Sequence, residues 1–280
     1  MTITREGLAA FGKDLRESET AASTESRYLR VAEIFADWLG ERDLDKELLL
    51  EWRGAQKKST ATVNVSVSAL NRLMRFMGHD ELRIRQLRKQ RSVYRASKRE
   101  MTRDEYERLV RTAERLGKIR LARAIETICA TGIRVSELRY VTVEALEERQ
   151  VTGRNKGKTR TILLSAALVR KLRRYCRARG IKSGPVFVTR SGKPIARTQL
   201  WAEMKALCKE AGVEPSKVFP HNLRHLFAVT HYKQHKDIVR LADLLGHNSV
   251  NTTRIYLMTS GEEQRRELDA MHLVLPDLSA

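Results

Sequence analysis

The sequence is poor in cysteine and contains no long uninterrupted run of apolar residues. Its three cysteines lie far apart and form neither a CxxC pair nor the spacing of a zinc site (Cys129, Cys176 and Cys208). We therefore expect buried free thiols in a reducing compartment. No apolar run approaches the roughly 20 residues that cross a bilayer, and the first residues lack the apolar core of a signal peptide. These absences favour a cytoplasmic protein with no membrane partner.

The sequence also lacks an acidic cluster with metal-ligand spacing, and it lacks a glycine-rich loop of the kind that holds nucleotide phosphates. We therefore expect neither Mg²⁺ nor ATP, and no other cofactor. No segment repeats at a fixed period and none is of low complexity. An ordinary folded chain is favoured, because 41% of its 280 residues are hydrophobic.

Positive charge is what the chain has in excess. Lys and Arg number 54 against 34 Asp and Glu, which gives a net charge of +20, and the pI is about 10.3. Such a surface favours a polyanionic partner, with nucleic acid as the first choice because each neutralised phosphate releases counterions. An anionic membrane fits poorly, because no polybasic amphipathic helix is evident. A merely basic surface without such a partner is the remaining alternative.

The apolar spacing divides the chain into a helical N-terminal part, a basic linker and a larger C-terminal part. Helical periodicity predicts helices at 26–39, 44–52 and 62–77 within residues 1–87. Residues 88–100 carry six basic side chains and no apolar periodicity. We interpret this segment as a linker that crosses a phosphate backbone, with a solvated loop as the alternative. The expected DNA-contacting residues are Arg88, Lys89, Arg91, Arg95, Lys98 and Arg99.

The C-terminal part, residues 101–280, begins with a capping box, in which Thr102 and Glu105 satisfy each other's backbone N–H groups. Alternating Thr, Val and Ile around a Gly- and Lys-rich centre predict a β-hairpin over 149–164. Helices are expected at 104–116, 121–130, 166–179, 197–211, 222–234, 238–245 and 261–271. The predicted fold class is mainly α with a small antiparallel β-sheet, in two domains.

Two segments of the C-terminal part carry cations where a phosphate is readily bound. Arg134 follows a glycine turn at the head of a helix, where its guanidinium can bind a phosphate through two hydrogen bonds and Glu137 can brace it. Lys156 lies on the turn of the predicted hairpin, from which a lysine can enter a cleft and deliver a proton. The plain alternatives are a surface helix cap and an exposed turn lysine.

Two further segments combine histidine with arginine or tyrosine. His221 and Arg224 are three positions apart, so they share one helix face. One can move a proton while the other stabilises developing negative charge. Tyr256 follows His247 by nine positions. Because a phenol has a pKa near 10, it is a poor nucleophile unless its surroundings stabilise charge. Taken alone, each of these features is more typical of ordinary surface or core residues.

Together and in this order, the segments resemble the tyrosine recombinases, also called the phage-integrase family. The shared pattern is an Arg in a TGxRxSEL box, a Lys in a basic hairpin, HxxR, LLGH and TTxxY. The resemblance covers about residues 101–260, and the two-domain layout extends it to nearly the whole chain. It implies that residues 1–87 form a core-binding domain that grips DNA as a clamp with the catalytic domain. No additional N-terminal arm-binding domain is expected.

The resemblance also implies a role for each residue. Arg134 and Arg224 are expected to hold the scissile phosphate, and His221 to accept the tyrosine proton. His247 is expected to donate a hydrogen bond to a non-bridging oxygen, and Tyr256 to form a 3′-phosphotyrosyl link.

The general acid that protonates the leaving 5′-oxygen is expected to be Lys156. The hairpin departs from the commonest GKGxKxR run, because an extra residue stands between Gly153 and Lys156, so Lys158 competes for this role.

Three functions fit this resemblance. The first is a site-specific recombinase or integrase that exchanges DNA strands through a Holliday junction, as a homotetramer on DNA, with a monomer in solution compatible with this function. The second is a type IB topoisomerase-like enzyme, which swivels one duplex. The third is a DNA-binding regulator without activity, against which the full set of site residues argues. The segments around 154–162 and 219–228 favour integrases of mobile elements. The apolar tail after 271 is expected to dock on a neighbouring protomer, with folding back onto its own domain as the alternative.

Overall fold

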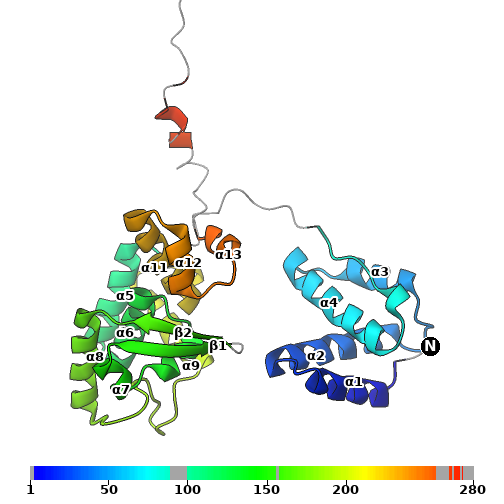
Figure 1. Cartoon of the computed structure of the whole chain (residues 1–280), viewed down its shortest axis with the longest axis horizontal. Helices are drawn as coiled ribbons and strands as arrows, with labels where there is room; N and C mark the ends of the chain where they lie inside the picture. Colours follow the sequence, from blue (N-terminus) through cyan, green and yellow to red (C-terminus); the bar gives the residue numbers. More distant parts are fainter. Residues whose placement is uncertain are drawn as a thin grey trace, which may run out of the picture. The chain divides into compact units, whose positions relative to one another are not determined.

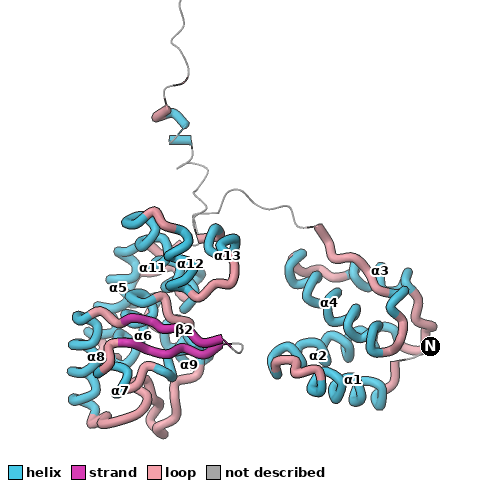
Figure 2. The backbone as a smooth tube through the Cα atoms, in the orientation of Figure 1, coloured by secondary structure: helices cyan, strands magenta, loops and turns pink. Residues whose placement is uncertain are grey.

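The computed structural model describes residues 3–88, 100–155, 158–256, 265–266, 268–271 and 273, with the backbone alone at 154, 155 and 158. The chain forms two compact units, Met1–Ser92 and Val93–Ala280. Figure 1 shows α1 to α4 in the first unit and the later elements in the second. The predicted fold class is confirmed, because helices dominate and the one sheet among the described residues is a two-stranded antiparallel hairpin, drawn in magenta in Figure 2.

The first unit consists of four helices around one apolar core. Its elements are α1 (Arg5–Glu17), α2 (Ala22–Leu39), α3 (Lys46–Ala55), α4 (Thr60–Phe76) and the 3₁₀ turn η1 (Asp80–Leu82). The Trp52 ring meets the Phe35 ring edge-on at 5.4 Å, an arrangement that aromatic quadrupoles favour. An ion pair of 2.5 Å between Asp14 and Arg72 joins α1 to α4. The helices predicted at 26–39, 44–52 and 62–77 are therefore present, with ends shifted by a few residues.

The first helix of the second unit begins at the capping box that the sequence predicted. Thr102 accepts from the backbone N–H of Glu105, and the Glu105 carboxylate accepts from the N–H of Thr102. The first elements are α5 (Arg103–Arg115), α6 (Ile119–Thr131), the 3₁₀ helix η3 (Val135–Tyr140) and α7 (Val143–Glu147). Helix α6 is buried along most of its length and ends at Gly132, whose positive φ of 62° terminates it in the left-handed conformation.

The hairpin pairs β1 (Gln150–Asn155) with β2 (Lys158–Leu163) in antiparallel register, with Gly153 opposite Arg160. Its apolar side chains, Val151 and Ile162, are buried against the core of the second unit. Because side chains alternate along a strand, Arg160 lies on the same face as Ile162 and points inward. The hairpin therefore brings one arginine to the interior of this unit.

The remaining elements are α8 (Ala166–Arg179), α9 (Arg197–Lys205), α10 (Cys208–Ala211), η4 (Pro215–Lys217), α11 (Pro220–His235), α12 (Ile238–Leu245) and α13 (Val250–Arg254). The helix predicted at 197–211 is divided, because the N–H of Leu207 bonds to the carbonyl of Met204 in a 3₁₀ turn. Most of the predicted helix at 261–271 and of the tail at 272–280 lies outside the described residues.

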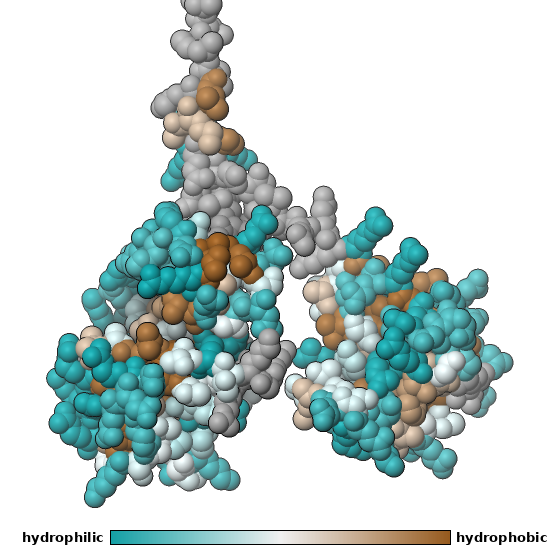
Figure 3. Space-filling model, in the orientation of Figure 1, coloured by the Kyte–Doolittle hydropathy of each residue, from teal (hydrophilic) through white to brown (hydrophobic). Residues whose placement is uncertain are grey.

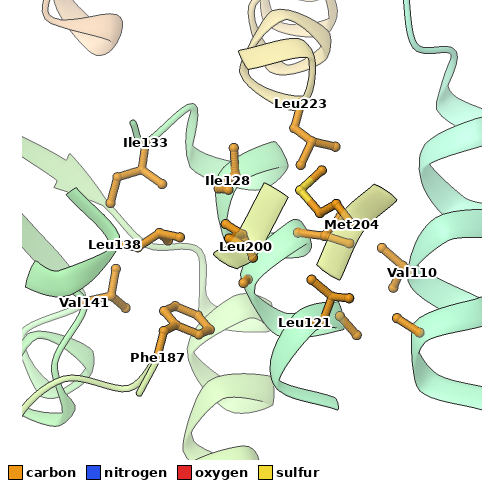
Figure 4. Packing of buried hydrophobic residues seen from close by; sticks show 14 of the residues in the cluster. Val110, Leu121, Ile128, Ile133, Leu138, Val141, Phe187, Leu200, Met204 and Leu223 are labelled. Carbon is orange, nitrogen blue, oxygen red and sulfur yellow. The ribbon is translucent and has the colours of Figure 1, made fainter. Parts of the chain in front are cut away.

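The core of the second unit positions α11. Figure 4 shows Leu223 pointing from this helix toward the side chains of α6 and α9, among them Ile128, Leu200 and Met204. Leu223 and its neighbour Arg224 are both buried. The apolar anchor therefore fixes the turn of α11 that carries the HxxR residues.

Candidate active site

Three arginine side chains from different elements meet the C-terminal end of α12. Arg134 caps η3, Arg160 lies in β2 and Arg224 lies in α11, and we call these three residues the arginine cluster. Each donates to a different one of three consecutive carbonyl oxygens, in the pairs Arg160–Leu244, Arg224–Leu245 at 2.6 Å and Arg134–Gly246 at 2.9 Å. The last carbonyls of a helix have no partner inside the helix and form the negative end of its dipole. This helix end therefore collects and stabilises the three cations.

Glu137 is the carboxylate within the arginine cluster. Its side chain is fully buried and accepts from the backbone N–H and the guanidinium of Arg134, at 2.9 and 3.1 Å, and from Nη2 of Arg160 at 2.8 Å. Burial alone would raise the pKa of Glu137, but the hydrogen bonds and charges of the two arginines hold the pKa below its ordinary value. The expectation that Glu137 braces Arg134 is confirmed, and Glu137 also braces Arg160.

Arg224 is the most buried of the three cations, with 3% of its surface exposed. Beyond Leu245 it donates to the carbonyl of Gly132, at the end of α6. Burial, followed by the charges of Arg134 and Arg160, lowers its pKa to about 10, so the guanidinium keeps its charge near neutral pH. Two helix ends thus hold this cation through carbonyl dipoles.

Two glycines make room for the cluster. Gly246 has a φ of +59°, and a Cβ there would lie 2.5 Å from Cδ of Arg160. A Cβ at Gly132 would lie 2.6 Å from the Phe227 ring. A side chain at either position would also be strained by the left-handed backbone. Gly246 therefore lets the Arg160 side chain approach the end of α12, and Gly132 lets the Phe227 ring pack against the end of α6.

His247 lies between Arg224 and α13. Its Nε2 is 3.0 Å from Nη2 of Arg224, and its Nδ1 is 2.9 Å from the hydroxyl oxygen of Thr253. Burial, followed by the charges of Arg224, Arg134 and Arg160, lowers the pKa of His247 to about 4. The ring is therefore neutral at physiological pH.

Tyr256 follows α13 and is almost fully buried among histidines, with 7% of its surface exposed. Its ring stacks on His247 at 5.6 Å between centroids and 11° between planes, and it contacts the rings of His221 and His225 at 5.7 and 5.3 Å. The hydroxyl oxygen lies 3.5 Å from Nε2 of His221, which is close to hydrogen-bonding distance. These rings hold the phenol in one orientation beside the HxxR face.

A pocket of about 980 Å³ opens over these groups. Its walls include Arg134, His221, Arg224, His247 and Tyr256. Its rim is completed by α9, which contributes Arg197, Trp201 and Lys205 at intervals of four residues, on one helix face. The structure therefore brings five of the six predicted catalytic residues to one pocket with a basic rim.

The predicted site residues outside this pocket belong to the hairpin turn and the linker. Lys156 and the linker residues Lys89, Arg91, Arg95, Lys98 and Arg99 lie outside the described residues. Lys158 is placed by its backbone in β2, and Arg88 is exposed at the end of the first described range.

Sequence reasoning missed Arg160 and Thr253. A usable signal for Arg160 was its place on the apolar face of a strand, in step with Ile162. For Thr253 the signal was its place three positions before Tyr256, on the same helical face.

The described part of the chain shows neither a candidate metal site nor a helix that could cross a membrane. Nowhere in it do three or more His, Cys, Asp or Glu side chains gather in a way that would bind a metal ion. None of its helices has both the length and the apolar character needed to traverse a bilayer.

Solved structures of an integrase and of a site-specific recombinase share the fold of this chain. The chain superposes on a lambda integrase fragment (75–356), solved as a dimer bound to a COC′ core site, with a TM-score of 0.73 over 91% of this chain and 95% of that one, at 18% identity. It also superposes on the XerH site-specific recombinase in a post-cleavage complex with difH, with a TM-score of 0.67 over 87% and 77% of the two chains, at 24% identity. Likeness at this identity establishes the fold.

Sequence comparison establishes the family. The tyrosine recombinase XerD of Xanthomonas axonopodis pv. citri (strain 306) is 36% identical over 165 residues, which cover 53% of this chain and 52% of XerD. XerA of Pyrococcus furiosus is 28% identical over 227 residues, covering 79% and 77% of the two proteins. The chain thus spans about half the length of the XerD relative. Because the model of the phage integrase family matches residues 99–263, more than half of the chain, this protein belongs to the phage integrase family of tyrosine recombinases.

Proposed function

We propose that this protein is a site-specific DNA recombinase that cuts and rejoins strands through a 3′-phosphotyrosyl intermediate and a Holliday junction. One observation carries the proposal. The phenol of Tyr256 and the guanidinium groups of Arg134 and Arg224 line the same pocket. A phosphodiester held by the two arginines would therefore lie next to the nucleophile.

The chemistry assigns a role to each group. The Tyr256 oxygen attacks the scissile phosphorus, and the nearby His221 accepts the phenol proton. Arg134 and Arg224 bind the non-bridging oxygens, and His247 donates a further hydrogen bond. As the bond to the 5′-oxygen breaks, a lysine of the hairpin protonates that oxygen. In the second half of the reaction a DNA 5′-hydroxyl attacks the phosphotyrosine, which restores the phosphodiester and frees the phenol.

The charge of the site suits this transition state. The three guanidinium groups of the arginine cluster and the single Glu137 carboxylate leave an excess of positive charge in a buried place. Fixed cations aimed at developing negative charge act strongly where water is excluded. In many phosphoryl-transfer enzymes divalent metals supply this charge. We therefore propose cleavage without a metal ion or nucleotide.

The partner we propose is a double-stranded DNA recombination site. The net charge of +20 and the basic pocket rim formed by Arg197 and Lys205 support phosphate contacts. Residues 1–87 would form the second jaw of a DNA clamp, and residues 88–100 the basic linker that crosses the phosphate backbone. Lys158 would add a phosphate contact from the hairpin.

We further propose that four protomers assemble on two DNA sites, each docking its C-terminal tail on a neighbour. Two observations support an interface in this part of the protein. The tail segment 272–278 contains three leucines and one valine. Figure 3 shows one of the hydrophobic areas of the surface over the α12–α13 end, and Val239 in α12, Val250 in α13 and Ile255 next to α13 are exposed.

A suicide-substrate assay tests the proposal. DNA from the boundaries of the coding region, nicked near the candidate cleavage position, should form a denaturation-resistant adduct with the wild-type chain. Tyr256→Phe should form none, although its binding should stay nearly intact because the basic surface provides the affinity. Adduct formation by the Phe variant would refute the assignment.

Paired sites should then yield a Holliday junction, which separates a recombinase from a topoisomerase-like enzyme that relaxes one duplex. DNA binding without any adduct would instead favour a regulator.

A further inference from the structure

The contacts of His247 determine which of its ring nitrogens carries the proton. An arginine guanidinium can only donate, so the nitrogen that faces Arg224, Nε2, must accept. In a neutral ring the proton then lies on Nδ1, which donates to the hydroxyl oxygen of Thr253 at 2.9 Å. Thr253 is fully buried, so this contact is fixed by packing. The protein without DNA therefore holds His247 with Nε2 lacking a proton.

This state is the opposite of the one that a phosphate needs. A phosphate oxygen accepts hydrogen bonds, so Nε2 must carry a proton before it can donate to one. Moving the proton from Nδ1 to Nε2 would reverse the hydrogen bond with Thr253, because its hydroxyl would have to turn and donate to Nδ1. Adding a second proton keeps that contact and makes the ring a cation. The second route fits the site once negative charge has entered it.

We propose that Arg224 and Thr253 together hold His247 as the Nδ1–H form, and that a phosphate entering the pocket separates Nε2 from Arg224 and draws a proton onto it from solvent. Thr253 is thus a positioning residue, and phosphate binding is coupled to proton uptake at one histidine. The inference rests on the proposed function in taking the phosphate to be that of the DNA backbone.

The charges around the ring explain why the proton is absent beforehand. Arg224 and His221 face it from α11, Arg134 from η3, Arg160 from β2, and the Tyr256 phenol from beyond α13. The single carboxylate of the group, Glu137, is already bound to two of these arginines. Together with burial, the cations lower the pKa of His247 to about 4. A phosphate in contact with the same arginines offsets their charge, which raises the pKa of the ring, since an opposite charge within about 4–6 Å shifts a pKa by roughly one to three.

Nuclear magnetic resonance of the full chain labelled with ¹⁵N in histidine tests both halves of the proposal. Long-range ¹H–¹⁵N spectra distinguish a protonated from an unprotonated ring nitrogen, and His247→Gln assigns the signal among the seven histidines. In the free protein we expect Nδ1–H and an unprotonated Nε2 at pH 7. A proton found on Nε2 would overturn the inference. Thr253→Val should weaken the preference for Nδ1–H, because Nδ1–H loses its acceptor, and Thr253→Ser, which keeps the hydroxyl, should retain it.

The second measurement uses Tyr256→Phe, so that no strand is cut. A short DNA duplex and, separately, inorganic sulfate, whose charge is constant near neutral pH, are added while the His247 signal is titrated. We expect the pKa of His247 to rise by about one to three. Calorimetry at about pH 5.5, above the pKa of about 4 in the free protein and within the range that such a rise gives, should show matching proton uptake in buffers of different ionisation enthalpy, and His247→Gln should abolish it. An unchanged His247 pKa overturns the coupling when, in a second sample labelled with ¹⁵N in arginine, the guanidinium signals of the arginine cluster respond to the anion.

The adduct assay on the wild-type chain distinguishes this failure from failure of the proposed function. Adduct formation without proton uptake refutes only the coupling. Normal His247 behaviour with sulfate but no adduct on any DNA leaves the inference supported as a property of a phosphate site and counts against recombination.

Discussion

Nη2 of Arg224 donates a hydrogen bond to the carbonyl oxygen of Leu245 at 2.6 Å. The bond places a buried cation on the negative end of a helix dipole. A carboxylate in that position would cancel the charge, whereas a carbonyl stabilises it and leaves it available. Arg224 therefore stays positive in a nearly dry site, which is the condition under which a cation binds a phosphate most strongly.

We predict that Glu137→Gln destabilises the catalytic unit by about 3–5 kcal/mol, because removing one partner of a buried ion pair leaves the other charges uncompensated. Thermal and urea unfolding would measure the loss. Glu107→Gln is the matched control, since Glu107 also contacts two arginines, Arg103 and Arg111, but on an exposed helix face. Its cost should stay below about 1 kcal/mol. Equal losses in the two variants would contradict the importance of burial.

We also predict that the contribution of Glu137 to the free energy of unfolding depends on pH. The pKa of Glu137 is held below its ordinary value of 4.5, so its contribution to stability is complete above that value and is lost as the pH falls through the folded-state pKa. The difference in unfolding free energy between the wild type and Glu137→Gln should therefore be constant above about pH 5 and shrink in more acidic buffer. If the difference between the two unfolding free energies grew on acidification, the predicted lowering of the Glu137 pKa would be contradicted.

The hairpin lysines can be separated by the leaving group. Lys156→Ala should slow cleavage of ordinary DNA by about 10²–10⁴-fold, the usual contribution of a general acid. A 5′-bridging phosphorothiolate should restore the rate, because sulfur leaves without a proton. Lys158→Ala is the comparison, and we expect it to weaken binding without such rescue. Rescue of Lys158→Ala alone would transfer the general-acid role to Lys158.

Cleavage should continue in excess EDTA and without added nucleotide, because guanidinium groups supply the charge that metals supply elsewhere. Binding should weaken with salt, and the logarithm of the association constant should fall linearly with the logarithm of salt concentration, because the counterions released on binding enter a more concentrated salt solution. Adduct yield with and without EDTA and binding isotherms across a salt series would measure the two effects. A strict requirement for Mg²⁺ in the cleavage step would contradict the mechanism.

Deleting residues 272–280 should leave binding of one protomer to a half-site intact. Cooperative pairing and recombination should weaken, because the apolar tail would no longer contact a neighbour. Native gels and a recombination assay on the truncated chain would show this. Replacing Leu273 and Leu275 by serine in the full-length chain is the matched variant that keeps the length. Full recombination by both would mean that the tail has no part in assembly.

The apolar periodicity of the sequence and its helix-capping and helix-terminating residues were enough to predict most of the fold. Helices at 166–179 and 238–245 were predicted to the residue, because a serine or aspartate cap begins each and a glycine follows it. The short helix α13 was not predicted, since its five residues are too few to show an apolar period. The division of 197–211 into two helices depends on one 3₁₀ turn at Leu207, and the amino-acid composition of the segment does not indicate such a turn.

The sequence predicted most of the residues of the site but few of the hydrogen bonds between them. Arg134, Arg224 and Tyr256 could be named because motif spacing identifies them. The bond from Arg160 to Leu244 could not, because the two are 84 positions apart and the acceptor is a backbone carbonyl, which every residue possesses. The contact between His247 and Thr253 is local, but it becomes visible only when the loop after α12 folds back.

The arginine cluster is anchored to the main chain of α12 through three successive carbonyl groups. Main-chain oxygens survive any change of side chain, so the surface of this helix is free to vary between relatives without disturbing the cations. A change of length is a different matter. One residue inserted or deleted inside α12 would rotate its last turn by about 100° and carry all three acceptors away from their arginines together. Along this segment we therefore expect relatives of the protein to differ by substitution and to keep their spacing, and engineers who wish to redirect such an enzyme should treat α12 in the same way.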